Sequence, residues 1–252
     1  MTNLIESFSV NIEDINYEKL KTDSLIDNIL DGGFEKGIVT TIYGPASSGK
    51  TNICVLSTVN NALKNKKIMY IDSEGGFSLK RVEQLLGIET QNNPLLKQVL
   101  NNIILVKPKS FKDQTTIIYA LEDYLKDNQV DAIIIDSIGM LYRLDRSDLD
   151  IMSANYDLSK QINVLHNLAE EYNIPVIVTN QVYALFDQKD KIRVVGGDII
   201  TYSSKCLIEL EKEENYRKIK LKKHRHLPEK EDYFIIYDRG IKSLEEYSKW
   251  QN

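Results

Sequence analysis

One eight-residue stretch constrains the fold of this 252-residue chain more than any other. It fills every fixed position of the pattern Gly-x-x-x-x-Gly-Lys-[Ser/Thr], with Gly44, Pro45, Ala46, Ser47, Ser48, Gly49, Lys50 and Thr51. In this pattern small residues let successive backbone N–H groups converge on a phosphate. The lysine adds a mobile positive charge, and the final hydroxyl can ligate Mg²⁺. The stretch therefore predicts a phosphate-binding loop for a nucleoside triphosphate.

The residues on either side of this loop agree with the prediction. The β-branched run 38–43 before the loop indicates a strand, and the apolar residues after it recur at helical spacing. Those apolar residues are Ile53, Val55, Leu56, Val59 and Leu63. The motif requires a strand, a loop and a helix in this order, so a chance match in a Gly/Ser turn is the weaker interpretation.

Charge and cysteine content narrow the class of protein further. The net charge of −5 gives no overall basic field, so contact with nucleic acid would depend on local basic clusters. Cys54 and Cys206 lack Cys or His neighbours at metal-ligand spacing, which predicts reduced, buried thiols. No segment reaches the apolar length of a membrane span, and the N-terminus lacks a basic-then-apolar signal. We expect a cytoplasmic protein without a membrane partner.

Strand and helix patterns alternate along most of the chain. This alternation predicts an α/β fold, with a mostly parallel twisted sheet flanked by helices. We expect an N-terminal extension at 1–20, the α/β core at 21–240 and a C-terminal tail at 241–252. Within the core, the last segments appear as successive strands with little helix between them, which predicts an antiparallel extension of the sheet. These segments are 205–210, 216–223 and 233–237.

Three polar side chains follow apolar strands at their predicted carboxyl ends: Glu74, Asp136 and Gln181. Ligands collect at these ends in open α/β sheets. Glu74 is placed either to meet a triphosphate and its attacking water or to begin the following helix. Asp136 is the carboxylate near bound Mg²⁺ that a phosphate loop requires. Gln181 could sense a γ-phosphate or make a simple strand-end hydrogen bond.

Local positive charge gathers near the end of the core. Alternation along 218–222 points Lys218, Lys220 and Lys222 to one face, which is also typical of an ordinary solvated strand. The same alternation, continued through 223–226, predicts that Lys223 and Arg225 project to one side, with His224 turned away. Such a pair suits a shared anion. Since Lys50 already serves the triphosphate of its own subunit, the pair is more useful at a neighbour's site. A solvated or DNA-facing pair is the alternative.

This order of parts resembles the ATPase core of the RecA/Rad51/RadA recombinase superfamily, and within it the RadB family of archaeal recombinase paralogues. The similarity covers roughly residues 22–240, most of the chain. The specific stretches are 30–37, 70–75, 178–183, 196–198 and 223–229.

The resemblance implies roles for individual residues of the nucleotide site. Lys50, Glu74 and Gln181 would be catalytic: Glu74 would orient or activate water, and Gln181 would couple the γ-phosphate to the following DNA-binding loop. Asp136 and Thr51 would hold Mg²⁺, Asp136 through the water shell of the ion. Arg81 matches a position where relatives stack a side chain on adenine.

The resemblance also implies contacts outside that site. Segments 143–150 and 184–195 correspond to two loops that face DNA in filament-forming relatives. The DNA-binding candidates are Arg143, Arg146, Lys189, Lys191 and Arg193. Lys223 and Arg225 resemble a Lys-x-Arg pair that reaches into the nucleotide of a neighbouring subunit.

Two departures from the strand-exchange recombinases shape the functional expectation. The chain contains no Phe-x-x-Ala polymerisation motif, and we expect no helix-hairpin-helix domain before its core. The resemblance therefore implies an ATP-binding accessory protein of homologous recombination and repair, with weak ATPase activity. It would bind single-stranded or branched DNA, form homo-oligomers, and partner a strand-exchange recombinase or a branched-DNA nuclease. The alternatives are a fully active DNA-dependent ATPase or recombinase, and a nucleotide-regulated signalling ATPase of the clock-protein type.

Overall fold

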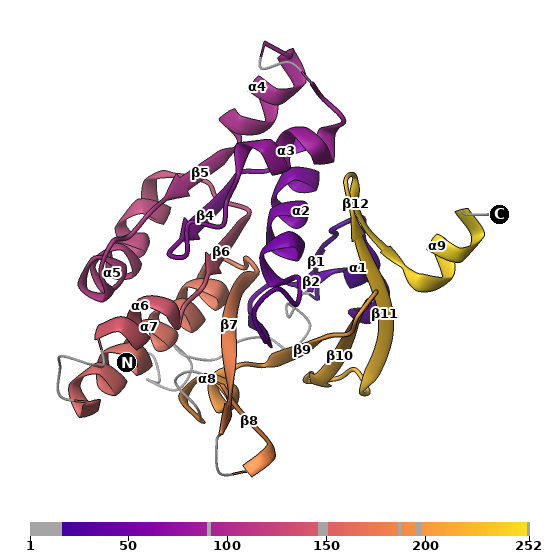
Figure 1. Ribbon diagram of the computed structural model, residues 1–252. Coiled ribbons are helices and arrows are strands. Elements are labelled where there is room, and N and C mark those ends of the chain that lie inside the picture. The colour runs from indigo at the N-terminus through magenta and orange to yellow at the C-terminus, as the bar shows by residue number, and fades with distance from the viewer. Residues whose placement is uncertain (1–16, 90–91, 146–150, 186–187, 195–197, 251–252) are drawn as a thin grey trace.

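The computed structural model describes residues 17–89, 92–145, 151–185, 188–194 and 198–250. Its core is a sheet in which six strands run parallel. These strands are β3 (Val39–Gly44), β4 (Ile68–Asp72), β5 (Ile103–Val106), β6 (Ala132–Asp136), β7 (Val176–Leu185) and β9 (Cys206–Lys212). They lie side by side in the order β9-β3-β7-β6-β4-β5 (Figure 1).

An antiparallel extension continues the sheet from β9, as the sequence predicts. Its strands are β10 (Arg217–Lys223), β11 (Lys230–Tyr237) and β12 (Gly240–Ser243), in the order β9-β10-β11-β12. Strand β8 (Gln188–Val194) pairs antiparallel with the end of β7. A separate two-stranded sheet joins β1 (Lys19–Leu20) to β2 (Phe34–Glu35).

Helices cover both faces of the parallel sheet. The first apolar layer lies under α1 (Leu25–Ile29), α2 (Lys50–Leu63), α3 (Leu79–Leu86) and α4 (Pro94–Asn101). The second lies under α5 (Phe111–Asp127), α6 (Met140–Asp145), α7 (Ile151–Glu171) and α8 (Asp198–Ser203). Helix α9 (Leu244–Trp250) follows the last strand. Within the described residues, no helix combines the length and apolar character needed to cross a membrane.

Strand β6 illustrates why the sheet is buried on both sides. Its residue Ile134 joins the apolar layer under α2, whereas Ile133 and Ile135 join the layer under α5 and α7. Because successive side chains of a strand point to opposite faces, a strand covered on both faces needs a continuous apolar run. This explains why the run is apolar until Asp136, where the strand ends.

The parallel register brings three strand ends to one edge of the sheet, level with the middle of β7, so Gln181 lies within its strand and not at the end where the sequence predicted it. Gly44 at the end of β3 is level with Gln181 in β7, and Asp72 at the end of β4 is level with Asp136 at the end of β6. The segments that follow these strands therefore meet at the same edge, where open α/β sheets bind their ligands.

Candidate nucleotide-binding site

The predicted phosphate loop connects the end of β3 to the start of α2. Ser47 and Gly49 adopt positive φ angles of 62° and 109°, which curl the backbone between strand and helix. In the described part of the chain, no side chain caps α2, and its first turn carries no acidic residue. The first N–H groups of a helix lack intrahelical partners and carry partial positive charge. The amino end of α2 therefore suits an anion.

Lys50 is a buried cation within this loop. Its side-chain Nζ donates to the carbonyl oxygens of Gly44 and Pro45, both at 2.9 Å, and the residue is only 7% exposed. Burial lowers the pKa of the ammonium, while the charges of Glu74 and Asp136 oppose this shift. Nearby, the buried Oγ of Ser48 has no hydrogen-bond partner among the described residues. A buried ammonium beside an unpartnered hydroxyl fits a phosphate group.

Glu74 and Gln181 meet beside this loop, although they come from different strands. The side-chain Nε2 of Gln181 lies 3.1 and 3.3 Å from the two carboxylate oxygens of Glu74, close enough to donate a hydrogen bond. The hydroxyl of Ser137, directly after β6, also donates to Glu74. The fold thus brings these two predicted site residues into contact. Their catalytic roles stay predictions.

Asp136 is a deeply buried acid at this edge. Its carboxylate accepts a hydrogen bond from the Tyr70 hydroxyl at 2.9 Å and another from the Thr179 hydroxyl. Burial raises the pKa of Asp136, whereas hydrogen bonds from Thr179, Thr51 and Tyr70 oppose that rise. The oxygen atoms of Thr51 and Asp136 are therefore close neighbours. Hydroxyl and carboxylate oxygens are the ligands that Mg²⁺ prefers, so this pair fits the predicted metal position.

Gly76 approaches this pair closely. A Cβ atom on Gly76 would lie 3.0 Å from Cγ2 of Thr51 and 3.8 Å from Oδ2 of Asp136. The segment after β4, which carries Glu74, is therefore held directly against the start of α2.

Arg81 joins helix α3 to the turn between β11 and β12. Its guanidinium donates to the carbonyl oxygens of Asp238 at 3.0 Å and Tyr237 at 3.1 Å. Burial lowers the pKa of the guanidinium, an effect that the charge of Asp238 opposes. The structure thus places Arg81 against the antiparallel extension. Its predicted contact with adenine stays a prediction.

The predicted alternation of Lys223 and Arg225 is wrong. Strand β10 ends at Lys223, and its pairing with β9 shifts register between Leu221 and Lys223. Lys223 Nζ reaches the carbonyl oxygens of Tyr202 and Thr201 in α8, at 3.3 and 3.5 Å. Arg225 lies beyond the strand and contacts β2 instead, so the two cations have separate partners. Their predicted role at a neighbour's site stays a prediction.

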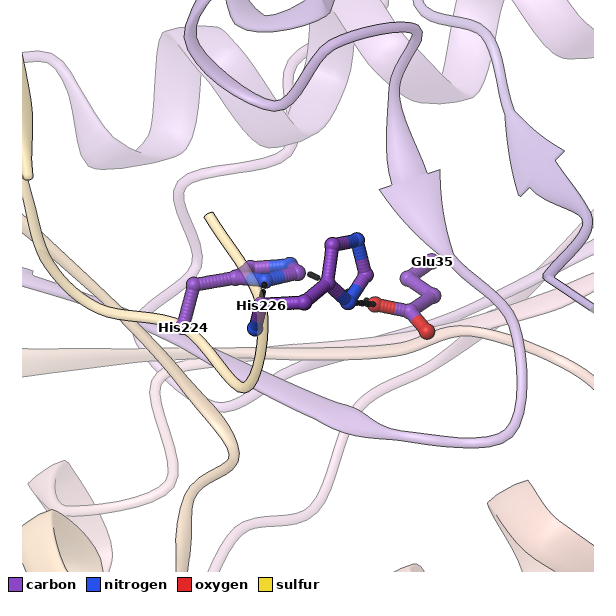
Figure 2. A group of neighbouring side chains, drawn as sticks. All are labelled: Glu35, His224 and His226. Carbon is purple, nitrogen blue, oxygen red and sulfur yellow. Dashed lines mark hydrogen bonds and ion pairs between the residues drawn. The ribbon is translucent and has the colours of Figure 1, made fainter. Parts of the chain in front are cut away.

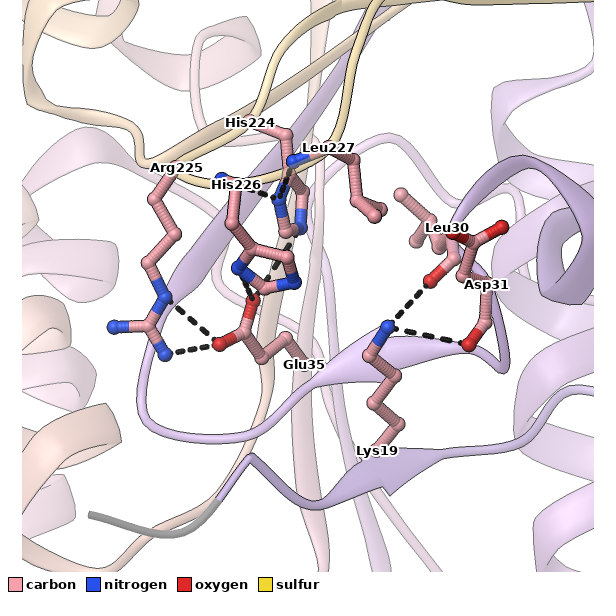
Figure 3. A network of polar contacts seen from close by, with 8 residues as sticks. All are labelled: Lys19, Leu30, Asp31, Glu35, His224, Arg225, His226 and Leu227. Carbon is pink, nitrogen blue, oxygen red and sulfur yellow. Dashed lines mark hydrogen bonds and ion pairs between the residues drawn. The ribbon is translucent and has the colours of Figure 1, made fainter.

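Arg225 belongs to a polar group that sequence reasoning missed, the Glu35 cluster of Glu35, His224, Arg225 and His226 (Figures 2 and 3). Nε of Arg225 donates to Oε1 of Glu35 at 2.8 Å. Nε2 of His224 lies 3.3 Å from Oε2 of Glu35, and Nδ1 of His226 lies 3.9 Å from the same oxygen. About 190 positions separate Glu35 from these partners, so no local pattern could reveal the cluster.

The hydrogen bonds of His224 argue against a metal ion in this cluster. Its Nδ1 accepts from the backbone N–H groups of His226 and Leu227, at 3.4 and 3.3 Å. A neutral imidazole that accepts at Nδ1 carries its proton on Nε2, the atom that faces Glu35. That Nε2 then offers no lone pair to a cation. Burial also lowers the pKa of His224 to about 4, which keeps it neutral. The cluster instead fastens the segment after β10 to the N-terminal hairpin.

Lys218 and Lys220 share one face of β10, and each of Lys218, Lys220 and Lys222 has an acidic partner. Lys218 lies 2.8 Å from Glu231, Lys220 lies 2.6 Å from Glu211, and Lys222 lies 3.7 Å from a third glutamate, Glu229. These pairs offset the positive charge of the three lysines.

The DNA-binding candidates lie in two places. Arg143 is exposed in α6, where a guanidinium nitrogen lies 3.6 Å from the sulfur of Met140. Arg146 lies outside the described residues. Lys189, Lys191 and Arg193 belong to β8, for which the structure describes only the backbone. The hairpin of β7 and β8 extends past the sheet on the phosphate-loop side, because Gln181, level with Gly44, precedes it (Figure 1).

A mostly parallel sheet with a phosphate loop after a central strand, and a glutamate after β4 in contact with a glutamine of β7, defines the class of RecA-like phosphate-loop proteins. The Rad51 family model matches residues 18–244. The "DNA repair and recombination protein RadB" of Methanobrevibacter smithii is 40% identical over 88% of this chain and 95% of its own length. That of Methanocaldococcus jannaschii is 39% identical over 88% of this chain and 100% of its own.

A solved structure is similar as well. The "Crystal structure of the RadB recombinase" is 33% identical, with a TM-score of 0.72 over 89% of this chain and 99% of that one. The chain therefore belongs to the Rad51 family and, within it, to the RadB proteins.

Proposed function

We propose that this chain is an ATP-binding and DNA-binding accessory protein of homologous recombination and DNA repair, with weak ATPase activity. The observation that carries the proposal is the contact of Gln181 with Glu74 beside the phosphate loop. This contact links Glu74, which is placed to meet an attacking water, to β7. Strand β7 leads into the predicted DNA-binding hairpin. The proposed process, DNA repair and recombination, is taken from the names of the relatives.

In this proposal the loop amides, the end of α2 and Lys50 bind the phosphates. Thr51 and Asp136 hold Mg²⁺, which would supply electrostatic stabilisation to the phosphate chain. Glu74 orients water. Gln181 can contact either Glu74 or a γ-phosphate oxygen, so nucleotide state is passed along β7 to the hairpin that carries Lys189, Lys191 and Arg193. ATP binding then acts as a switch for DNA binding.

The proposed weak ATP turnover is explained by a shortage of cations at the γ-phosphate within one subunit. Residues Lys223 and Arg225 have partners within their own subunit, in α8 and β2. In this proposal, the further cation that the γ-phosphate needs in the transition state comes from a neighbouring copy of the protein. Cations supplied in this way accelerate phosphoryl transfer by roughly 10³ to 10⁵ in other enzymes. An isolated subunit should therefore hydrolyse ATP slowly. The proposal also includes a role in regulating a strand-exchange recombinase or a branched-DNA nuclease.

Three measurements on one preparation test this function. ATP and ADP binding is measured by calorimetry, and turnover is measured with and without single-stranded DNA. Incorporation of labelled phosphate into the protein is followed in parallel. We expect micromolar or tighter nucleotide binding and turnover well below a typical 1–100 per second. Rapid DNA-stimulated turnover with strand exchange would favour an active recombinase, and self-phosphorylation without DNA binding would favour a signalling ATPase.

A further inference from the structure

Arg217 begins β10 on the face of the extension that packs toward α2. It is paired with Phe234 of β11, and alternate residues of a strand share a face. The next residues on that face, Ile219 and Leu221, are fully buried in the apolar layer that includes α2. The side chain of Arg217 therefore continues this face at the end nearest the phosphate loop.

The stem of Arg217 packs directly on that loop. A Cβ atom placed on Gly49 would lie 3.5 Å from Cδ of Arg217 and 3.1 Å from Cδ1 of Ile236. Gly49 is the last loop residue before α2, where the N–H groups of the loop and helix are available to a phosphate. The guanidinium begins one bond beyond Cδ, so it starts close to the loop that would hold the phosphates.

Arg217 lacks the partner that other cations of β10 possess. Within the described residues, its buried Nε donates to no hydrogen-bond acceptor and its guanidinium forms no ion pair. Lys218 and Lys220, on the opposite face, each pair with a glutamate. An unpartnered buried donor costs about 1–3 kcal/mol, and more when it is charged. An arginine in this position is suited to an anion that arrives from outside.

We propose that Arg217 binds the phosphate chain of the nucleotide held by its own subunit's phosphate loop, at the diphosphate portion that ADP and ATP share. The inference rests on the proposed nucleotide binding and extends it with a residue that comes from the antiparallel extension. Lys50 reaches the phosphates from α2, whereas Arg217 reaches them from β10. Nucleotide binding would thus tie the extension to the parallel core.

The test compares Arg217→Gln, which removes the charge but keeps most of the stem, with Arg217→Lys, which keeps a charge. Lys218→Gln is the matched control, because its side chain lies on the other face. Calorimetry with ADP, ATP and inorganic pyrophosphate gives the affinities. A hydrogen bond to a charged group contributes enough that Arg217→Gln should lose about tenfold or more for all three ligands. Arg217→Lys should lose less, and Lys218→Gln should match the parent.

Three results would overturn the inference. If Arg217→Gln binds ADP and pyrophosphate as the parent does, while Lys50→Ala loses both, the nucleotide site stands and Arg217 is not part of it. If the parent binds neither ligand, the proposed function and the inference fall together. If Arg217→Gln does not fold, hydrogen exchange of the parent protein is measured with and without ADP. The inference predicts that ADP slows exchange of the amides at the start of β10. Unchanged exchange there would contradict it.

Discussion

Arg225 and Glu35 are in contact although they lie 190 positions apart in the chain, with Nε of the arginine 2.8 Å from Oε1 of the glutamate. Glu35 is 1% exposed, and the arginine side chain is 38% exposed. The contact ties the segment after β10 to the N-terminal hairpin. To reach a neighbour's nucleotide, Arg225 would have to leave this buried carboxylate. Its predicted role between subunits is therefore open to a direct test.

The first prediction concerns the pair Lys223→Ala with Arg225→Ala. If these cations complete the site of a neighbour, the double variant should lose turnover at high protein concentration but keep its ATP affinity in dilute solution. Parent turnover per subunit should rise with protein concentration, because only assembled copies have complete sites. Steady-state assays over a wide range of protein concentration measure both effects. Turnover that is independent of concentration and of the double substitution contradicts this role.

The second prediction follows from the neutral, buried His224. Burial lowers its pKa to about 4 in the folded chain, whereas an unfolded histidine has a pKa of about 6.5. Between these values the unfolded state binds the extra proton, so the free energy of unfolding falls as the pH falls. We expect a loss of about 2–3 kcal/mol by pH 4 from this residue.

Chemical denaturation at several pH values from 7 to about 4 measures this loss, and His224→Gln provides the comparison. The difference in unfolding free energy between parent and variant should shrink as the pH falls through that window, because only the parent carries the titrating ring. A difference that stays constant with pH would show that His224 does not titrate as its burial requires.

The third prediction separates two roles of Arg81. Its contacts with the carbonyl oxygens of Tyr237 and Asp238 predict that Arg81→Ala lowers the free energy of unfolding by about 1–2 kcal/mol. A contact with adenine predicts in addition that ADP and ATP bind more weakly, by similar factors, while pyrophosphate binding is spared. Calorimetry with the three ligands distinguishes the roles. Loss confined to ATP, or equal loss for pyrophosphate, would exclude the adenine contact.

The fourth prediction concerns DNA binding by strand β8. The protein has a net charge of −5, so affinity for DNA should depend on local cations and fall steeply with salt through counterion release. Replacing Lys189, Lys191 and Arg193 with glutamine should flatten the plot of log affinity against log salt by about 0.7–0.9 per lost phosphate contact. Replacing Lys218, Lys220 and Lys222, which pair with glutamates, is the matched control. An unchanged slope in the β8 variant would move the DNA site elsewhere.

The parts of the site that the sequence predicts are those fixed by local pattern or by the topology of a parallel sheet. The phosphate loop is a contiguous motif. Glu74, Asp136 and Gln181 could be placed at one edge because each follows an apolar run, and parallel strands share an edge. The two-sided burial of β6 was likewise visible as an apolar run. In each case, a short-range signal is sufficient once the fold class is known.

The remainder depends on contacts between distant segments. Nothing near Glu35 in sequence marks it as the partner of Arg225, and only the end of β10 at Lys223 reveals that the alternation stops there. Arg217 was hidden in the same way, because its significance lies in the approach of Gly49 from another part of the chain. Helix α4 was missed although a signal was present: Asn93 caps it, and Pro94 occupies its first turn.

The central claim, that nucleotide binding at the phosphate loop controls DNA binding, is tested by one series of electrophoretic shifts. Branched, single-stranded and duplex DNA are titrated with the parent and with Lys50→Ala, each without nucleotide, with ADP and with ATP. Since the hydrogen bonds of the Lys50 side chain to the described residues go to two carbonyl oxygens of the loop, the variant should fold and still bind DNA. We predict that ATP changes the affinity of the parent for single-stranded or branched DNA, and that Lys50→Ala loses this response. DNA affinity that is the same with and without ATP in the parent, or no DNA binding at all, would contradict the account.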